Sequence, residues 1–133
     1  MQNFKWTDNY DTKITIIDIQ HKQLFKKIDI LTIAIYEGKS KKFLKELLLF
    51  LEEYIEKHFT FEENIMKLNN YPDYDKHILQ HEQFRSLFND FADDFKLKGG
   101  DSYLAIRLEK EIRKWWEYHI LNIDMMYVPY IIK

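Results

Sequence analysis

His58-Phe59-Thr60-Phe61-Glu62 and His77-Ile78-Leu79-Gln80-His81 are the two segments that decide the fold, and a Tyr71-Pro72 break separates them. Each segment carries two side chains that can bind a metal, spaced four residues apart. Residues at i and i+4 lie on one face of an α-helix, so each pair can point to a single spot. This stretch therefore predicts two helices that pack side by side and direct four polar side chains to one point.

The remaining histidines of the chain extend the same pattern. All five histidines, together with one acid, fall in register with the apolar stripe of an expected helix: His21, His58, Glu62, His77, His81 and His119. A single histidine on an apolar face is usually an ordinary core residue. Several buried imidazoles and a buried carboxylate are costly unless they are paired or bind a metal. The pattern favours a metal site over the alternative of a metal-free bundle with histidines as packing.

Apolar residues recur at steps of three and four along four stretches, which predicts four helices. Their stripes run over residues 17–35, 44–65, 74–95 and 104–119. Asp18, Ser40 and either Asp101 or Ser102 are the expected N-caps, and Gly38 is the expected C-cap of the first helix. Short connections between the helices favour an all-α, antiparallel up-down-up-down four-helix bundle.

The two ends of the chain lack this regular spacing. Residues 1–16 show no sustained period and are expected to form an extended N-terminal arm lying on the bundle. The apolar tail 125–132 is expected to fold back over the bundle end, with a subunit contact as the alternative. We expect one domain over residues 1–133.

His119 and Asp124 are five residues apart, a spacing that an undistorted α-helix places on different faces. For both to reach one site, the backbone around Leu121-Asn122-Ile123 must depart from ideal α geometry. A bulge or a helix end is therefore expected there.

The composition excludes several classes of protein. Only three glycines and two prolines argue against a turn-rich all-β fold, and a net charge of −2 gives no reason to expect a nucleic-acid partner. The absence of cysteine excludes disulfides, iron–sulfur clusters and thiolate zinc sites. No secretory signal or membrane-spanning run is visible, so a cytoplasmic location without a membrane partner is expected.

The types and number of the candidate ligands limit which metals the site could bind. Imidazole and carboxylate suit iron, zinc, copper or nickel. Seven protein ligands, with Asp124 as the seventh, exceed the four of a tetrahedral zinc site and suit two ions joined by bridging carboxylates. Imidazoles outnumber acids, unlike the Glu-x-x-His sites of ferritin-like enzymes. Fewer anionic ligands favour the reduced pair of ions and reversible dioxygen chemistry.

Together these segments resemble one family, the hemerythrins, and specifically their single-domain bacterial type. The motifs that carry the resemblance are Asp18-Ile19-Gln20-His21, His58-Phe59-Thr60-Phe61-Glu62-Glu63, His77-Ile78-Leu79-Gln80-His81 and His119-Ile120-Leu121-Asn122-Ile123-Asp124. The resemblance covers essentially the whole chain and implies a four-helix bundle with a non-haem di-iron centre. One departure is Lys13, which stands where many bacterial members have glycine.

The resemblance also implies a role for each candidate residue. His77, His81 and His119 would hold one iron, and His21 and His58 would hold the other. Glu62 and Asp124 would bridge the two ions together with an oxo or hydroxo group. The residues that resemble the family's oxygen pocket are Leu24, Phe59, Trp115 and Ile120. Ordinary core packing is the alternative for each of these four, and Tyr127 would stand behind the ligands.

The function that this resemblance implies is reversible dioxygen binding for storage, transport or scavenging, rather than enzymatic turnover. Two alternatives stay open at this point. One is a sensor whose surface changes with oxygen or redox state. The other is a di-iron enzyme that reduces peroxide or nitric oxide or repairs damaged iron centres. The chain is expected to be a monomer or a weak homo-oligomer.

Overall fold

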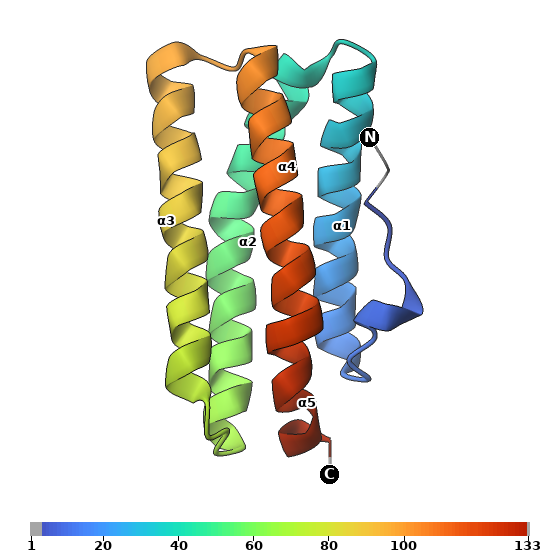
Figure 1. Cartoon of the computed structure of the whole chain (residues 1–133), viewed down its shortest axis with the longest axis vertical. Helices are drawn as coiled ribbons and strands as arrows, with labels where there is room; N and C mark the ends of the chain where they lie inside the picture. The colour runs from blue at the N-terminus through green and yellow to red at the C-terminus, as the bar shows by residue number, and fades with distance from the viewer. Residues whose placement is uncertain (1–3, 133) are drawn as a thin grey trace.

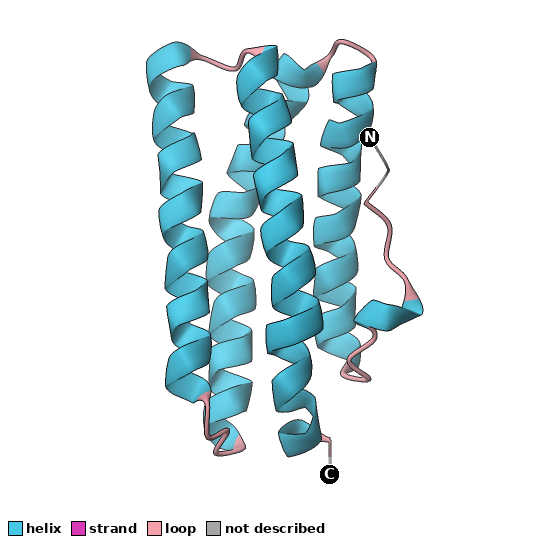
Figure 2. Ribbon diagram, viewed as in Figure 1, coloured by secondary structure: helices cyan, strands magenta, loops and turns pink. Residues whose placement is uncertain are grey.

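Four long helices run alternately up and down in the computed structural model, which describes residues 4–132 (Figure 1). They are α1 (Thr15–Tyr36), α2 (Ser40–Leu68), α3 (Tyr74–Lys98) and α4 (Ser102–His119). Short loops join them, and no strand occurs among the described residues (Figure 2). The predicted all-α four-helix bundle is confirmed. Residues 1–3 and 133 of the expected domain lie outside the described part of the chain.

The core is divided into three layers along the bundle axis. A small apolar cluster at one end contains Ile17, Met66, Tyr71 and Tyr127. A much larger apolar cluster, which includes Leu24, Phe59, Phe84 and Trp116, fills the rest of the bundle. The candidate ligands lie where these two clusters meet: on the first helix, His21 lies between Ile17 of the small cluster and Leu24 of the large one. The polar layer is thus enclosed by apolar side chains at both ends.

Three helices are followed by a residue with a positive φ, and after α3 this residue is Gly99, with φ +73°. Gly38 has φ +72° after α1, and Asn70 has φ +53° after α2. After α1, the residue that follows Gly38 donates a hydrogen bond back into the last turn of the helix. This bond runs from the Lys39 N–H to the Ala34 carbonyl, at 2.8 Å. This is the Schellman motif, in which glycine occupies the position just beyond the C-cap. The C-cap of α1 is therefore Glu37, one residue before the predicted Gly38.

The N-terminal ends of the first two helices differ from the predictions. The N-caps are Ile14 and Lys39, not Asp18 and Ser40. The predicted Asp101 cap of α4 is confirmed, since its Oδ1 accepts the Leu104 N–H at 2.7 Å.

Asp18 lies one turn inside α1 and has a different partner. Its Oδ1 accepts hydrogen bonds from the Thr12 backbone N–H at 3.0 Å and from the Thr12 hydroxyl at 2.8 Å. The Thr12 hydroxyl in turn accepts the Ile14 N–H at 3.1 Å. Because the preceding loop supplies these bonds, α1 starts earlier than its apolar stripe suggested.

The arm before α1 runs along the bundle as predicted (Figure 1), with one short 3₁₀ turn, η1 (Asp8–Tyr10). Phe4 stacks on Phe25 of α1 with ring centroids 4.0 Å apart, and Tyr10 meets the same ring edge-on. Phe4 and Tyr10 are both buried. The arm is therefore part of the core packing.

The C-terminal segment continues the line of α4. A π-helical turn, η2 (Ile120–Asp124), follows His119 and leads into α5 (Met125–Ile131). The predicted departure from α geometry is confirmed. The predicted fold-back of the tail is wrong, because the backbone at the helix junctions stays in the right-handed helical region and keeps its direction. Tyr127 is nevertheless fully buried against the end of the bundle.

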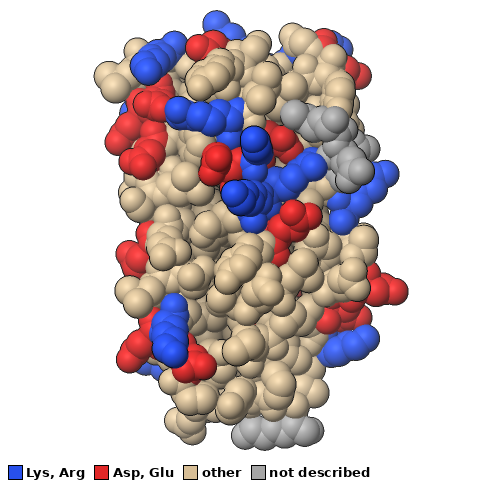
Figure 3. Space-filling model, in the orientation of Figure 1, with Lys and Arg blue, Asp and Glu red and all other residues tan. Residues whose placement is uncertain are grey.

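On the face drawn in Figure 3, charged side chains are concentrated in the upper half, and the lower half is mainly uncharged. Exposed apolar side chains near the end of α4 and beyond it include Tyr118, Leu121 and Met126. That the chain is a monomer or a weak homo-oligomer stays a prediction.

Within residues 4–132, no helix is both long and apolar enough to cross a membrane.

Candidate metal centre

Seven ionisable side chains meet in the polar layer, and none is more than 2 % exposed. Each of the four long helices contributes at least one of them. They are His21 from α1, His58 and Glu62 from α2, His77 and His81 from α3, His119 at the end of α4 and Asp124 at the end of η2. The structure brings together every residue that the sequence named as a metal ligand. Their role as ligands is taken up below as a proposal.

The ligand atoms form two compact groups, and within each group they all lie within 4.8 Å of one another. The three-histidine group contains Glu62, His77, His81 and His119. The two-histidine group contains His21, His58, Glu62 and Asp124. Glu62 belongs to both groups. The arrangement is that of a buried site for two metal ions.

The two carboxylates lie between the histidine sets. Oδ1 of Asp124 is 3.0 Å from His119 Nε2 and 3.2 Å from His77 Nε2, while its Oδ2 is 3.2 Å from His21 Nε2. Oε1 of Glu62 is 3.4 Å from His58 Nε2 and 3.3 Å from His81 Nε2. Each carboxylate can therefore reach a cation held by either set.

These close approaches lack the geometry of hydrogen bonds. All five Nε2 atoms, Oε1 of Glu62 and both oxygens of Asp124 are buried without a hydrogen-bond partner in the described chain. Leaving one such group unsatisfied costs about 1–3 kcal/mol, more for a charge, and here eight atoms share the problem. Nitrogen and oxygen lone pairs that converge in this way fit metal cations, which would satisfy all of them at once.

Burial keeps two of the imidazoles neutral. It lowers the pKa of His58 from 6.5 to about 4, although the nearby Glu62 opposes the shift. It lowers the pKa of His81 from 6.5 to about 3, helped by His77 and His119. Metal ligation requires the neutral imidazole, so these two side chains are ready to coordinate at neutral pH.

Asp124 and the histidines around it shift one another's pKa values. Burial alone would raise the pKa of Asp124, but His119, His21 and His77 around it hold that pKa well below its usual range. In the same way, burial alone would lower the pKa of His77, and the Asp124 carboxylate raises it instead. Asp124 is thus an anion buried among imidazoles, which is what a bridging ligand requires.

Two imidazoles are oriented by oxygen atoms that face their Nδ1 atoms. His58 Nδ1 lies 2.6 Å from Oε1 of Gln20, and His81 Nδ1 lies 2.8 Å from Oε2 of Glu63. Acceptors in this position place the proton on Nδ1 and leave Nε2 free for a metal. Sequence reasoning did not identify Gln20 and Glu63 as these partners, since both contacts cross from one helix to another.

The bridging candidate Glu62 is also held from outside. The Tyr127 hydroxyl donates to its Oε2 at 2.6 Å. Burial, and then the negative charges of Glu62 and Asp124, raise the pKa of Tyr127 well above its ordinary value, so the phenol keeps its proton. Tyr127 therefore stands behind a candidate ligand, as expected from the sequence.

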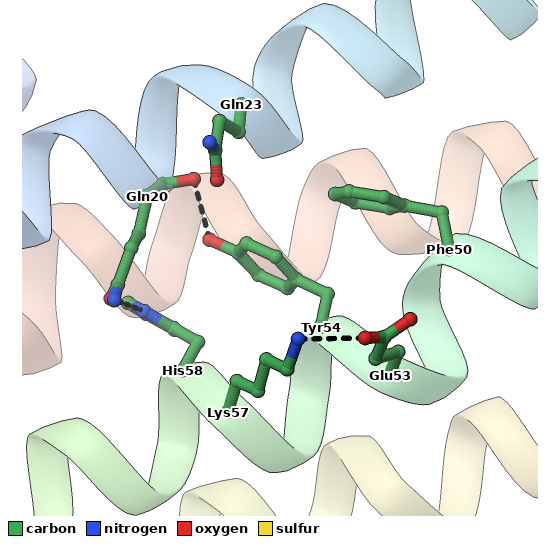
Figure 4. Close-up of a pocket in the computed structure, with 7 residues that line it drawn as sticks. All are labelled: Gln20, Gln23, Phe50, Glu53, Tyr54, Lys57 and His58. Carbon is green, nitrogen blue, oxygen red and sulfur yellow. Dashed lines mark hydrogen bonds and ion pairs between the residues drawn. The ribbon is translucent and has the colours of Figure 1, made fainter.

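A cleft of about 270 Å³ between α1 and α2 reaches the outer edge of His58 (Figure 4). Tyr54 stacks on the His58 ring at 5.2 Å and donates to the Gln20 backbone carbonyl at 2.7 Å. An exposed ion pair between Lys57 and Glu53 also lines the cleft. His58 itself is buried at the edge of the cleft, with Nδ1 bonded to Gln20 and Nε2 facing the buried Glu62 carboxylate.

The four residues expected to form an oxygen pocket differ in how deeply they are buried. Leu24, Phe59 and Ile120 are fully buried in the large cluster, and Trp115 packs against it half-buried. Phe59 stacks on His81 at 3.7 Å, and Trp115 stacks on His119 at 4.4 Å. Both of these aromatic rings thus shield the three-histidine group. An oxygen pocket formed by the four residues stays a prediction.

Sequence reasoning missed Trp116, which is fully buried. Its ring centroid is 5.7 Å from that of His58 and 5.9 Å from that of His119, so it adjoins both groups of ligands. The signal was present, because Trp116 follows Ile112 by four residues and belongs to the same face. The expected stripe used Trp115 instead.

Comparisons with known proteins show which proteins this chain is similar to. A family model described as the hemerythrin HHE cation binding domain matches residues 12–131. The bacteriohemerythrin of Pseudomonas paraeruginosa is 31% identical over 128 residues, which is 96% of this chain and 81% of that protein. The myohemerythrin of Theromyzon tessulatum is 30% identical over 93% of this chain and 90% of its own length. A crystal structure of a hemerythrin point mutant has a TM-score of 0.78 with 23% identity, covers 98% of both chains and supports the fold.

Proposed function

The chain belongs to the hemerythrin HHE family, and on that premise we propose that it binds dioxygen reversibly at a pair of iron ions. The observation that carries the proposal is the set of buried, unpartnered nitrogen and oxygen atoms that converge between four helices. Two cations would satisfy the Nε2 and carboxylate lone pairs that the described chain leaves without partners. We further propose that residues 1–133 form one domain of this family, without an enzymatic role.

We assign the ligands by their grouping. His77, His81 and His119 would hold one ion, and His21 and His58 the other, with Glu62 and Asp124 shared between them. The ion with fewer histidines would keep a position for an external ligand. When bound, the iron pair supplies the electrons that dioxygen takes up on binding and returns on release.

The rest of the site would keep this exchange reversible by holding ligands in place and excluding water. Gln20 and Glu63 fix two of the imidazole rings, and Tyr127 fixes Glu62. Leu24, Phe59 and Ile120 are fully buried beside the polar layer. A dry apolar surround slows proton entry to the bound ligand and so slows loss of the reduced state.

The experiment that tests the proposal is an optical spectrum of purified protein, reduced without air and then exposed to air, with iron quantified. We expect about two irons per chain, a colourless reduced form and absorption bands that disappear when oxygen is removed. His119→Ala should lose iron, while replacement of the exposed Glu52 by Gln should not.

Two outcomes would contradict the proposal. Protein that folds but takes up no iron pair would remove its basis. Iron-loaded protein that passes directly to the oxidised form on exposure to air would instead favour a redox sensor or a peroxide-reducing enzyme.

A further inference from the structure

We propose that the indole N–H of Trp116 donates a hydrogen bond to a small acceptor, dioxygen or an anion of similar size, bound at the metal centre. The inference rests on the proposed function. It starts from one atom: Nε1 of Trp116 is buried and has no hydrogen-bond partner in residues 4–132. The whole side chain is inaccessible to solvent.

The rings around this indole make no hydrogen bond with its N–H. Its ring neighbours are aromatic side chains, with Phe84 at 5.2 Å and Phe59 at 5.7 Å between centroids. Tyr54, at 6.0 Å, uses its hydroxyl as a donor to the Gln20 carbonyl. The Nε2 atoms of His58 and His119 are directed at the carboxylates of the candidate metal site. None of these neighbours accepts a hydrogen bond from the Trp116 N–H, which has no partner in the described chain.

An unsatisfied donor in the core lowers stability, and phenylalanine or leucine would fill an apolar space without that loss. Trp116 also adjoins both ligand groups, through His58 and His119. An acceptor that arrives with the bound ligand would satisfy the N–H and would be stabilised in return. Dioxygen that has taken up electrons, and small anions such as azide, are acceptors of this kind.

Trp6 provides a matched control within the same chain. Its Nε1 is also buried without a hydrogen-bond partner in the described residues. Trp6, however, is a half-buried residue of the N-terminal arm, with the Lys22 ammonium 4.3 Å from the centre of its ring. Replacing either tryptophan removes one unpartnered N–H, but only Trp116 adjoins candidate ligands.

The test compares Trp116→Phe with Trp6→Phe in iron-loaded, oxidised protein titrated with sodium azide. We expect the azide dissociation constant to rise about tenfold in Trp116→Phe and to stay within twofold in Trp6→Phe. Dioxygen should dissociate faster from reduced Trp116→Phe by a similar factor. Equal azide affinity in both variants and the unmodified protein would overturn the proposal.

A second variant separates the hydrogen bond from the volume of the ring. Incorporation of 3-benzothienylalanine at position 116 keeps the bicyclic shape and replaces the N–H by sulfur, and we expect it to weaken azide binding as Trp116→Phe does. If it binds azide as tightly as the unmodified protein, the ring volume and not the N–H is responsible, and the proposal is wrong.

A third readout does not depend on the folding of a variant at position 116. The ultraviolet resonance Raman band that reports hydrogen bonding of an indole N–H should shift when azide binds to the unmodified protein, and the Trp6→Phe variant should keep that shift. An unshifted band would overturn the inference. Failure of the unmodified protein to bind two irons would instead count against the proposed function, so the two failures are distinguishable.

Discussion

At the scale of single residues, the two ligand groups differ in the acceptor behind their histidines. A carboxylate, Glu63, faces Nδ1 of His81, whereas an amide, Gln20, faces Nδ1 of His58. A carboxylate makes the opposite ring nitrogen a stronger electron donor than an amide does. The three-histidine group should therefore hold its ion more tightly, and the two-histidine group should exchange an outside ligand more easily.

Glu63→Gln tests this difference without changing a candidate ligand. Because the neutral amide attracts the Nδ1 proton less strongly, we expect metal affinity at the three-histidine group to fall by about 10–100-fold. The measurement is a competition titration of metal-free protein against a chelator of known affinity. Glu52→Gln, at an exposed position of the same helix, is the control. Equal affinity in both variants would mean that Glu63 only covers the site.

At the scale of elements, η2 decides whether α4 can complete the site. An α-helix turns about 100° per residue, so residues five apart lie on different faces. The π-helical turn over Ile120–Asp124 is wound more loosely, and it brings Asp124 back to the face of His119. The same helix then continues as α5 and places Tyr127 against Glu62. One local change of winding thus supplies both a candidate ligand and the side chain that holds another.

The arm before α1 contains a non-glycine residue in a backbone conformation that suits glycine. Lys13 has φ +66°, in the left-handed region that ordinary residues avoid. Asp11 compensates in part by accepting the Lys13 backbone N–H at 2.9 Å and the ammonium at 2.9 Å. The lysine therefore follows the path that a glycine would take at this position.

Lys13→Gly should accordingly stabilise the metal-free protein. We expect the midpoint of thermal unfolding to rise by a few degrees, because relief of the left-handed strain exceeds the loss of an exposed ion pair. Lys26→Gly, at an exposed helical position, should lower the midpoint by a similar amount. Calorimetry of both variants checks the sign, and a lower midpoint for Lys13→Gly would show that the Asp11 contacts outweigh the strain.

At the scale of the whole molecule, the polar layer reduces the stability of the bundle until metal is present. Apolar clusters on either side hold the layer together, so the helices can form around polar side chains that are shut off from solvent and do not satisfy one another. Metal binding would then contribute directly to folding stability, because the unfolded chain offers no assembled site.

The pH dependence of the metal-free protein follows from the buried histidines. The pKa values of His58 and His81 lie near 4 and 3 in the folded state, against 6.5 for an unperturbed histidine. Below pH 6.5 the unfolded chain binds more protons than the folded one, so the free energy of unfolding decreases as the pH falls towards 4. The raised pKa of His77 acts in the opposite sense, stabilising the fold at low pH and losing that effect as the pH rises through the folded pKa.

We expect the two lowered values to outweigh the raised one. Between pH 7 and pH 5, His58 alone should reduce the free energy of unfolding by about 2 kcal/mol. Urea titrations of metal-free protein at both pH values measure the change. Iron-loaded protein should lose less over this range, because coordinated imidazoles do not take up protons until the metal leaves. A metal-free protein that is equally stable at both pH values would contradict this prediction.

The sequence by itself determined the four helices, the histidines and Glu62 on their apolar faces, and the change of winding before Asp124. These features depend on spacing along one helix, and spacing can be read from a single chain. Tertiary structure decided which groups lie opposite one another. Asp18 was expected to cap α1 but binds the loop at Thr12, and the tail continues α4 where a fold-back was expected. Gln20, Glu63 and Trp116 acquire their neighbours from other helices. The rotation and axial offset of each helix are set by packing against the others, and periodicity along one helix carries no record of them.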